Sequence, residues 1–309
     1  MPLLKTAHTV DQCPVCGALE FQPVSTPGNP IGEPIFGPYL DQFGVCRCRC
    51  GLEFTNPRPS TQLLESFYGS RIYDCHKMNR SASADRNAQA LLDFIARNGA
   101  YSANKRLLDF GCGGGYFLAH AVRAGWSATG FDVGDAAIET CRANNLEITS
   151  QFSDLEPASF DVVVLNHVFE HIEEPADLLR SLRTLLGPYG ELVIVVPNVR
   201  SARARLSLPI LSRKCGFDER HRAFPIHLWY FSPSTIANLL RTAGFEPVVV
   251  TTQGMGLEEL RRHEIPEGVS AANVRAREKS RLKPVKDRIK STFYGLGLGE
   301  NVLAAARLS

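Results

Sequence analysis

Between residues 105 and 252, two kinds of hydrophobic pattern alternate along the chain. Nearly continuous apolar runs predict buried strands, and they occur at 106–110, 127–133, 160–167, 191–197 and 246–252. Segments with apolar residues three and four positions apart predict amphipathic helices, at 116–125, 135–145, 175–186 and 233–245. A short strand is also expected near 147–152 and a last one at 301–307. Strands that alternate with helices predict an α/β fold with a doubly wound parallel sheet.

The pattern changes on the N-terminal side of this region, which divides the chain into three parts. Residues 1–56 are rich in Cys, Pro and Gly without a helical period, which predicts a small module made mostly of loops. Residues 57–104 predict a helical segment, whose first helix begins after Pro59 with Ser60 as its cap. We expect the remainder, 105–309, to form the α/β domain.

Charge is distributed unevenly along this chain. The whole protein carries 34 Lys and Arg against 32 Asp and Glu, and a net charge of +2 gives no general attraction to nucleic acid or anionic membrane. Residues 256–290 interrupt the alternation of strands and helices. The stretch from Arg261 to Lys290 contains ten basic and four acidic residues. We interpret this segment as a solvated, basic helical insertion. A patch for an anionic substrate or partner is the alternative interpretation.

The hydrophobic pattern predicts neither a membrane span nor a secretion signal. No apolar run reaches the roughly 18 residues that a transmembrane helix needs. The first residues, MPLLKTAHTV, lack the apolar region and the cleavage site of a signal peptide. Because 44% of the residues are hydrophobic, a proper core is expected. We therefore expect a soluble cytoplasmic protein without a membrane partner.

Five of the nine cysteines lie within the first 50 residues, which indicates a metal site rather than disulfides. Cys13 and Cys16 belong to a C-P-x-C-G sequence, typical of a zinc knuckle because glycine permits the tight turn around the metal. Cys50 supplies a third ligand. The fourth is Cys46 or Cys48, since both side chains would lie on the same side of an extended strand as Cys50. We favour Cys48, which predicts a structural zinc ion held by four thiolates.

A glycine-rich turn follows the predicted strand 106–110. Glycines are needed there because the backbone must turn sharply and let a ligand approach its bare amides. Asp132 ends the next strand, about twenty residues later, where a carboxylate can accept hydrogen bonds from both ribose hydroxyls of an adenosine-containing ligand. The G-x-G-x-x-G fingerprint of a nicotinamide enzyme needs its third glycine where this chain has Tyr116, which argues against that class of enzyme.

Several stretches together resemble the class I S-adenosylmethionine (SAM) dependent methyltransferases. LLDFGCGGGYF resembles their first motif, in which an acidic residue, here Asp109, precedes G-x-G, and GFDV resembles their second. FDVVVLNHVFEHIEEPADLLRSLRTLLGPYGELVIVVPN resembles a later block, and HLWYFSPSTIANLLRTAGFE resembles a segment of the branch related to ubiquinone-type O-methyltransferases. The resemblance covers about 105–252 and implies a Rossmann-like sheet of seven strands, closed by an antiparallel strand at 301–307. Many bacterial methyltransferases also carry a zinc ribbon, like the predicted one, before this domain.

The resemblance implies which residues would hold the methionine part of the cofactor SAM. Gly111 and Gly113 would line it, and Asp109 would contact its ammonium group directly or through water. Asn166, at the carboxyl end of the fourth strand, would lie near the sulfonium.

The same resemblance implies the residues around the adenosine part. Asp132 would hold the ribose, while Phe131 and Val133 would flank the adenine. The loop around 152–154 would face the adenine amino group.

A general base helps methyl transfer to a hydroxyl or to an activated carbon acid, whereas SAM itself supplies the electrophile. The candidate bases are His167 and His171, beside the fourth strand, and His227, which precedes an aromatic cluster. The pair Glu170–His171 resembles one that binds a divalent metal in some ubiquinone-pathway methyltransferases. There, an acidic residue lies four positions before the Glu. Here that position is Asn166, which argues against a catalytic metal.

These features favour a SAM-dependent methyltransferase that acts on a small molecule by O- or C-methylation. The alternative is an rRNA or tRNA base methyltransferase, since certain rRNA enzymes combine a zinc ribbon with this fold. Base-amino methyltransferases often carry an N/D-P-P-Y/F stretch, from which the sequence N-H-V-F at 166–169 differs, and the near-neutral charge also disfavours a nucleic acid partner. A scaffold without catalysis is disfavoured because the acidic and glycine positions of the cofactor motifs are intact.

Overall fold

The computed structural model describes residues 6–24, 33–68, 82–99, 105–202, 204, 223–254, 292 and 294–309. The basic segment predicted at 256–290, Cys75 and Cys215 therefore lie outside the described residues. Within the described part, no helix is both long and apolar enough to cross a bilayer. The cytoplasmic location stays a prediction.

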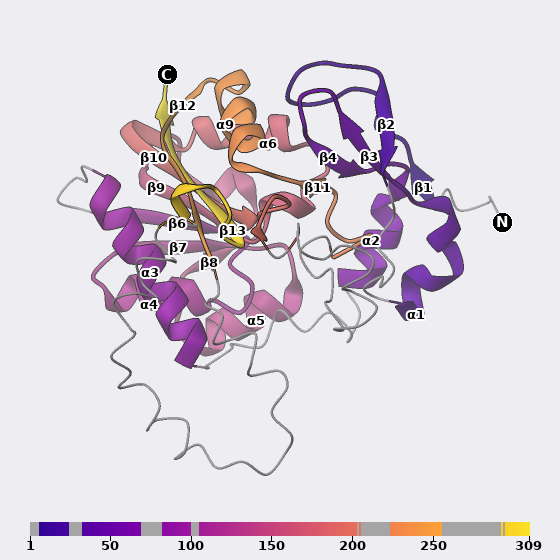
Figure 1. Cartoon of the computed structure of the whole chain (residues 1–309). Coiled ribbons are helices and arrows are strands. Elements are labelled where there is room, and N and C mark those ends of the chain that lie inside the picture. Colours follow the sequence, from indigo (N-terminus) through magenta and orange to yellow (C-terminus); the bar gives the residue numbers. More distant parts are fainter. Residues whose placement is uncertain are drawn as a thin grey trace, which may run out of the picture.

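A sheet of seven strands forms the centre of the larger part of the protein, in the order β12-β13-β10-β9-β6-β7-β8 (Figure 1). Its strands are β6 (Arg106–Phe110), β7 (Ser127–Phe131), β8 (Ile148–Thr149), β9 (Phe160–Asn166), β10 (Leu186–Pro197), β12 (Phe245–Gln253) and β13 (Asn301–Leu308). The first five pair in parallel, whereas β13 lies antiparallel between β10 and β12. The predicted doubly wound sheet and its closing antiparallel strand are thus confirmed.

Helices cover both faces of this sheet (Figure 1). They are α3 (Ala82–Asn98), α4 (Tyr116–Arg123), α5 (Asp135–Ala143), α6 (Pro175–Arg183) and α9 (Pro233–Thr242). The start of α9 is encoded locally, because Ser232 accepts from the backbone of Thr235 at 3.4 Å and Pro233 follows as the first helical residue.

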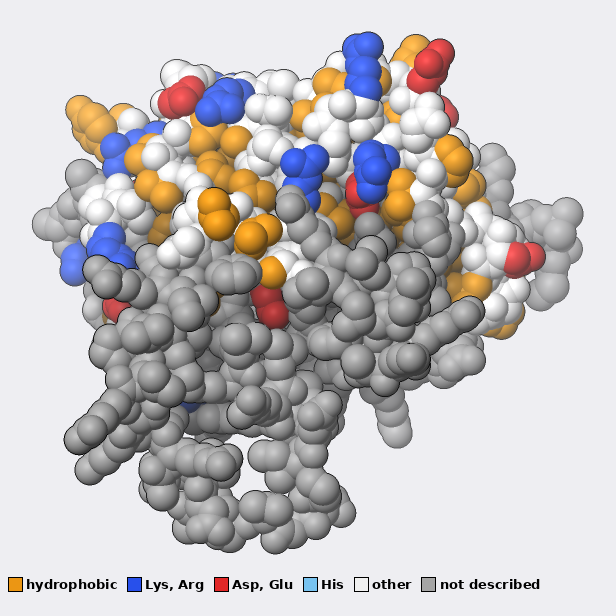
Figure 2. All heavy atoms as spheres, in the orientation of Figure 1, with side chains coloured by type: hydrophobic (Ala, Val, Ile, Leu, Met, Phe, Trp, Pro, Cys, Tyr) orange, Lys and Arg blue, Asp and Glu red, His pale blue; other side chains and the backbone are white. Residues whose placement is uncertain are grey.

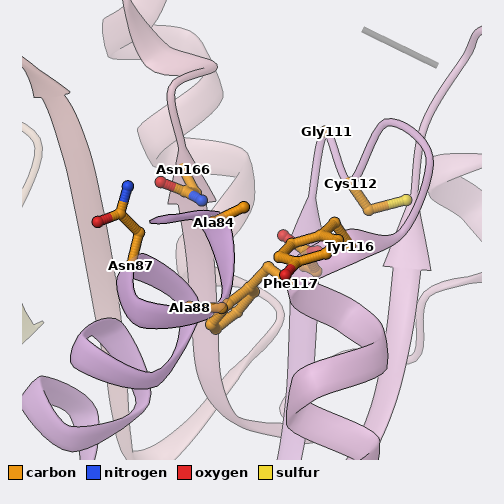
Figure 3. A pocket seen from close by; sticks show the side chains of 9 residues that line it. Ala84, Asn87, Ala88, Gly111, Cys112, Tyr116, Phe117 and Asn166 are labelled. Carbon is orange, nitrogen blue, oxygen red and sulfur yellow. The ribbon is translucent and has the colours of Figure 1, made fainter. Parts of the chain in front are cut away.

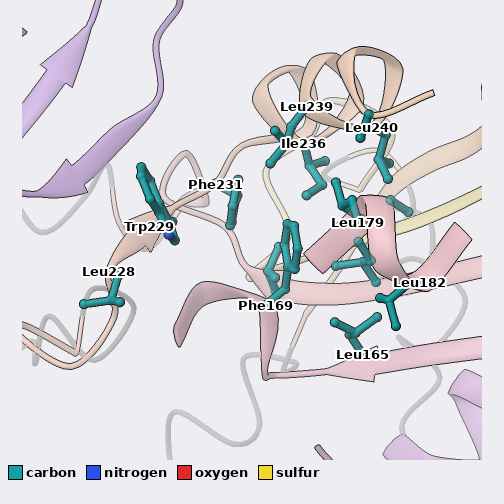
Figure 4. Packing of buried hydrophobic residues seen from close by; sticks show 14 of the residues in the cluster. Leu165, Phe169, Leu179, Leu182, Leu228, Trp229, Phe231, Ile236, Leu239 and Leu240 are labelled. Carbon is teal, nitrogen blue, oxygen red and sulfur yellow. The ribbon is translucent and has the colours of Figure 1, made fainter. Parts of the chain in front are cut away.

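Alternate residues of the central strands pack into two separate hydrophobic cores, one on each face of the sheet. Both sets of residues are therefore apolar, which explains the continuous apolar runs in the sequence. Leu165 packs with Leu179 of α6 and Leu239 of α9 (Figure 4). On the opposite face, Val164 and its neighbours pack with α3 and α4, for example with Leu118. The members of both cores are buried, so the central strands are shielded from solvent on both sides.

Residues 187–190, which connect the helix and the strand predicted from the sequence, lie inside a strand. The preceding helix ends at Arg183, and β10 begins at Leu186, which pairs with Phe160. The pairing then resumes at Glu191, opposite Val162, so that residues 187–190 bulge out of the ladder.

The N-terminal module forms its own four-stranded sheet, but one of the strands comes from the α/β part. The order is β11-β4-β3-β2, with β2 at Phe21–Val24, β3 at Val45–Cys48, β4 at Glu53–Thr55 and β11 at Trp229–Tyr230. A second, two-stranded sheet pairs β1 (Ala7–His8) with β5 (Arg58–Pro59), and α1 (Glu33–Phe36), the 3-10 helix η1 (Gly37–Gln42) and α2 (Thr61–Tyr68) complete the module. The short helices at 33–42 were not expected from the sequence.

Thr55 is the polar centre of the contact between the module and the α/β part. Its backbone N–H donates to the carbonyl of Leu228 at 2.9 Å, and its Oγ1 donates to the carbonyl of His227 at 2.8 Å. The same hydroxyl lies 2.8 Å from the hydroxyl of Tyr230. Because Thr55 is fully buried, all these groups lack water as a substitute partner. The boundary predicted at residue 56 stays a prediction, although packing is continuous across it.

We predict that Thr55→Val lowers the free energy of unfolding by about 1–3 kcal/mol, because it keeps the side-chain shape and leaves a buried carbonyl and hydroxyl short of a partner. Urea unfolding, followed by tryptophan fluorescence, measures this change. Thr61→Val is the matched control, since Thr61 makes an exposed hydrogen bond, and its effect should stay within about 0.5 kcal/mol. Equal effects of the two variants would contradict the prediction.

Candidate functional site

The candidate cofactor site lies where the chain reverses its winding direction in the sheet. From β6 the chain moves outward through β7 to β8, and it then crosses back to β9 on the other side of β6. The loops that leave β6 and β9 therefore run in opposite directions at the carboxyl edge. Such a point leaves a crevice in which α/β proteins bind ligands.

The glycine-rich turn after β6 requires its glycines for steric reasons. Gly111, Gly113 and Gly115 all have positive φ, of 75°, 52° and 76°. A Cβ on Gly111 would lie 2.5 Å from a methyl group of Val168, which follows β9. The turn is tied to β7, since the N–H groups of Gly111 and Cys112 both donate to the carbonyl of Phe131, at 2.7 and 3.1 Å.

Asp109 is a carboxylate that the fold leaves incompletely satisfied. It is 2% exposed, and its Oδ2 has no hydrogen-bond partner among the described residues. Burial and the nearby charge of Asp132 raise its pKa to about 7, against a smaller opposite effect of the Leu118 N–H. A buried carboxylate of this kind fits a ligand that brings a positive charge.

Asp132 holds the glycine-rich turn in place. Its Oδ2 accepts from the N–H of Gly113, and its Oδ1 accepts from the N–H of Gly134, both at 2.9 Å. A carboxylate offers about four acceptor positions, so it retains capacity for ligand hydroxyls. Asp132 thus connects the loops after β6 and β7 at one point.

A cavity of about 230 Å³ opens beside these loops (Figure 3). It is lined by Ala84, Asn87, Ala88, Asp109, Gly111, Cys112, Tyr116, Phe117 and Asn166. The structure thereby brings together Asp109, Gly111 and Asn166, three of the residues expected at the methionine end. Gly113 belongs to the same turn but is not among the lining residues.

The first turns of α3 form a wall of this cavity, which the sequence did not indicate. Ala84, Asn87 and Ala88 come from that helix (Figure 3). Asp85 anchors it to α4, because it accepts from the Tyr116 hydroxyl and lies 3.1 Å from Nε2 of His120. No motif marks α3, since its place over the cavity is a tertiary contact.

The two residues expected around the adenine differ in their exposure. Val133 is 76% exposed although it is apolar, so a flat apolar ligand group could cover it. Phe131 is buried, and its ring stacks on that of Phe110 with centroids 4.6 Å apart. Phe152, in the loop expected near the adenine amino group, contacts the edge of Phe131 at 6.3 Å.

The three candidate bases surround one buried carboxylate, that of Glu170. Nδ1 of His167 lies 3.5 Å and Nε2 of His227 4.0 Å from its Oε1. Burial alone would raise the pKa of Glu170, but the nearby imidazoles of His167, His171 and His227 together lower it to about 2. Glu170 is therefore ionised across the physiological range.

The three histidines differ in their access to solvent. The side chain of His167 is 46% exposed, and its backbone has a positive φ of 58° directly after β9. His171 is enclosed, with its Nδ1 at 3.0 Å from the hydroxyl of Tyr68, and burial lowers its pKa. His227 is buried as well. One ligand atom each of Glu170, His171 and His227 lies within 4.8 Å of the others, so these three could hold a metal ion.

Four thiols converge in the N-terminal module. The Sγ atoms of Cys13, Cys16, Cys48 and Cys50 all lie within 4.8 Å of one another. Two of the separations are 3.7 Å, between Cys13 and Cys50, and 3.4 Å, between Cys16 and Cys48. A tetrahedral zinc ion with bonds of about 2.3 Å requires sulfur separations of roughly 3.8 Å, so the set fits zinc. Cys46 stands apart, with its Sγ 3.6 Å from the carbonyl of Asn56.

Comparison with known proteins identifies the family of the α/β part. A family model described as a methyltransferase domain matches residues 82–250. A protein named "Ubiquinone biosynthesis O-methyltransferase" from Ralstonia nicotianae is 31% identical over 166 residues, which cover 50% of this chain and 68% of that protein. One of the same name from Saccharophagus degradans is 29% identical over 157 residues, 48% of this chain and 66% of that protein. Among solved structures, a SAM-dependent methyltransferase from Archaeoglobus fulgidus has a TM-score of 0.48 and 20% identity, over 72% of this chain and 93% of that chain.

The sulfur cluster predicts a zinc ion whose fourth ligand is Cys48. Purified protein should contain about one zinc ion per chain, and Cys48→Ser should lose most of it, because removal of one thiolate opens the coordination shell. Elemental analysis by mass spectrometry measures the zinc content. Cys46→Ser is the matched control and should keep its zinc. Loss of zinc from Cys46→Ser, with retention in Cys48→Ser, would reverse the assignment.

Proposed function

The chain belongs to the methyltransferase domain family, as a SAM-dependent enzyme, and from this premise we propose that it methylates an oxygen or a carbon of a small-molecule acceptor in the crevice beside β6 and β9. The observation that carries the proposal is the buried, incompletely satisfied carboxylate of Asp109 at the edge of the cavity. The curated relatives are named for ubiquinone biosynthesis. A quinone precursor or a similar phenol is therefore one class of acceptor to test.

The residues at the crevice fit the functional groups of SAM. The carboxylate of Asp109 would pair with the ammonium group, and Asn166 would lie beside the sulfonium. Asp132 would accept from the ribose hydroxyls, while the exposed side chain of Val133 would be covered by the adenine. This assignment stays a proposal for each residue, and the cavity volume suits the methionine part rather than the whole cofactor.

Bound SAM supplies an electrophilic methyl group, so the protein has to align the acceptor and remove its proton. Of the three histidines, His167 combines solvent access with the position next to Asn166, and we propose it as the base. Glu170 would accept a hydrogen bond from Nδ1 of His167, which leaves Nε2 free to take the proton. The ionised carboxylate would also stabilise the imidazolium formed in this step.

The enclosed histidines support a different role. His171 and His227 lie beside Glu170 without the exposure of His167. We propose that His171 and His227 stabilise the ionised carboxylate of Glu170 and help to shape the site where the methyl acceptor binds. A catalytic divalent metal at Glu170, His171 and His227 is the competing arrangement, and Asn166 in place of the expected acidic residue argues against it.

A role on RNA has no specific support in the described part of the chain. Figure 2 shows the described Lys and Arg side chains of one face scattered among hydrophobic and uncharged ones rather than gathered into a stripe. A basic stripe is the usual footprint of a nucleic-acid-binding surface. We therefore keep the small-molecule acceptor as the proposed function, and we propose the four-thiolate zinc ion as a structural cofactor.

The raised pKa of Asp109 predicts a pH dependence of cofactor binding. Below pH 7 the protonated carboxyl must release its proton before it can pair with an ammonium group, so the affinity for S-adenosylhomocysteine should rise with pH and level off above about 8. Below about pH 6 the slope should approach tenfold per pH unit. Titration calorimetry between pH 5.5 and roughly 8.5 measures this dependence.

Asp109→Asn tests the source of that dependence. It should weaken binding by about 10- to 100-fold at pH 8 and flatten the pH profile, because the charged hydrogen bond is lost. Glu139→Gln, on the exposed face of α5, is the matched control and should leave both affinity and profile unchanged. An unaltered affinity of Asp109→Asn would reject the proposed cofactor site.

His167→Gln should lower methyl transfer by about 10²- to 10⁴-fold while the affinity for S-adenosylhomocysteine stays within about twofold, because the base acts on the acceptor rather than on the cofactor. Consumption of SAM with an acceptor found by screening phenols and related metabolites measures the rate. His8→Gln, at an exposed position of β1 in the N-terminal module, serves as the control and should retain the wild-type rate. Full activity of His167→Gln would exclude His167 as the base.

A further inference from the structure

Two cysteines from different elements meet beneath the glycine-rich turn. The Cys112 thiol, in the turn itself, donates to the carbonyl of Gly113 at 3.7 Å, and the Cys141 thiol, on α5, donates to the same carbonyl at 3.4 Å. Both sulfurs therefore lie around one carbonyl oxygen. Neither sulfur belongs to the zinc cluster.

Backbone atoms confine both sulfurs to this spot. A Cβ on Gly130, in β7, would lie 2.8 Å from the Cys112 sulfur, and a Cβ on Gly115 would lie 2.7 Å from the Cys141 sulfur. Glycine is therefore the residue that leaves room for each sulfur, so the packing of the fold holds both thiols beside the Gly113 carbonyl.

The pair is chemically asymmetric. The neighbouring Cys112 thiol lowers the pKa of Cys141, against the opposite effect of burial. The neighbouring Cys141 thiol and burial both raise the pKa of Cys112. Cys141 is fully buried and Cys112 is partly exposed. A solute therefore reaches Cys112 first, and Cys141 is the better nucleophile for a second step.

We propose that Cys112 and Cys141 form a thiol–disulfide modification site, which a small disulfide oxidises and which weakens cofactor binding when it is oxidised. The thiolate of Cys141 accepts the proton of the Cys112 thiol as the Cys112 sulfur attacks one sulfur of R–S–S–R, which forms a mixed disulfide and releases one R–S⁻. That R–S⁻ then takes the proton from Cys141. The thiolate of Cys141 then attacks the Cys112 sulfur and releases the second R–S⁻. Two cysteine thiols are thereby oxidised to one disulfide, R–S–S–R is reduced to two R–SH, and the two cysteine protons pass to the released thiolates.

The loss of affinity follows from the position of Cys112 in the turn. A disulfide requires its sulfurs about 2 Å apart, closer than two sulfurs that are not covalently bonded. The turn must therefore shift toward α5. Cys112 stands between Gly111, which lines the cavity, and Gly113, whose N–H is bound to Asp132 at 2.9 Å. Both contacts of the proposed cofactor site would be displaced.

The experiment treats the zinc-loaded full chain with hydroxyethyl disulfide, a small neutral disulfide. Peptide mapping under non-reducing conditions identifies which cysteines are joined, and calorimetry with S-adenosylhomocysteine measures affinity before treatment, after it and after reduction. We expect a Cys112–Cys141 linked peptide and an affinity lower by about tenfold or more, restored by dithiothreitol. Cys112→Ser and Cys141→Ser should each abolish the linked peptide and the loss, whereas Cys46→Ser should behave as wild type.

Three results would overturn the inference: absence of the Cys112–Cys141 peptide under conditions that modify other cysteines, an unchanged affinity when that peptide is present, or an equal loss in the two serine variants. The inference rests on the proposed cofactor site, and the two fail in different ways. If the reduced protein does not bind S-adenosylhomocysteine, the cofactor site is wrong. Peptide mapping tests the dithiol independently of binding.

Discussion

The reversal of winding at β6 is the constraint on which the rest of the α/β part depends. Because β7 and β9 lie on opposite sides of β6, the loops that follow β6 and β9 separate, and the helices they lead into pack on different faces. The space between them is narrow at Gly111, where a Cβ would lie 2.5 Å from a methyl group of Val168, the second residue after β9. The groups proposed to touch the cofactor stand at the carboxyl ends of β6, β7 and β9 or on the loops that follow these strands.

The N-terminal module depends on the same region from the other side. Its sheet includes β11, which lies in the chain between His227 and α9. Directly before β11, the backbone N–H of Leu228 donates to the carbonyl of Glu170 at 2.8 Å. A module of this size buries little apolar surface by itself, and it shares one hydrophobic core with the α/β part. The zinc cluster, Thr55 and the proposed base are therefore parts of one continuous packed structure.

Two buried carboxylates illustrate how surroundings decide charge. Asp109 and Glu170 are both almost fully buried, yet the pKa of Asp109 is raised to about 7 and that of Glu170 is lowered to about 2. The difference is the partners, because Asp109 lies near the negative charge of Asp132 while Glu170 lies among three imidazoles. Asp109 therefore needs a cation from a ligand, whereas Glu170 already has imidazole partners within the protein.

The local pattern by itself determined the strands and most helices of the α/β part, the order of its cofactor motifs and the two cysteine clusters, because hydrophobic period, glycine and capping residues act over a few positions. Tertiary contacts decided the rest. The sequence favoured Cys48 over Cys46 without a geometric reason, and the packing of β3 turns the Cys48 sulfur to the cluster and the Cys46 sulfur to the carbonyl of Asn56. Three features join residues that are far apart in the chain. They are the cavity wall formed by α3, the pairing of residues 229–230 with the sheet of the module, and the proximity of Cys112 to Cys141. Such contacts depend on how finished elements pack, and no local pattern records them.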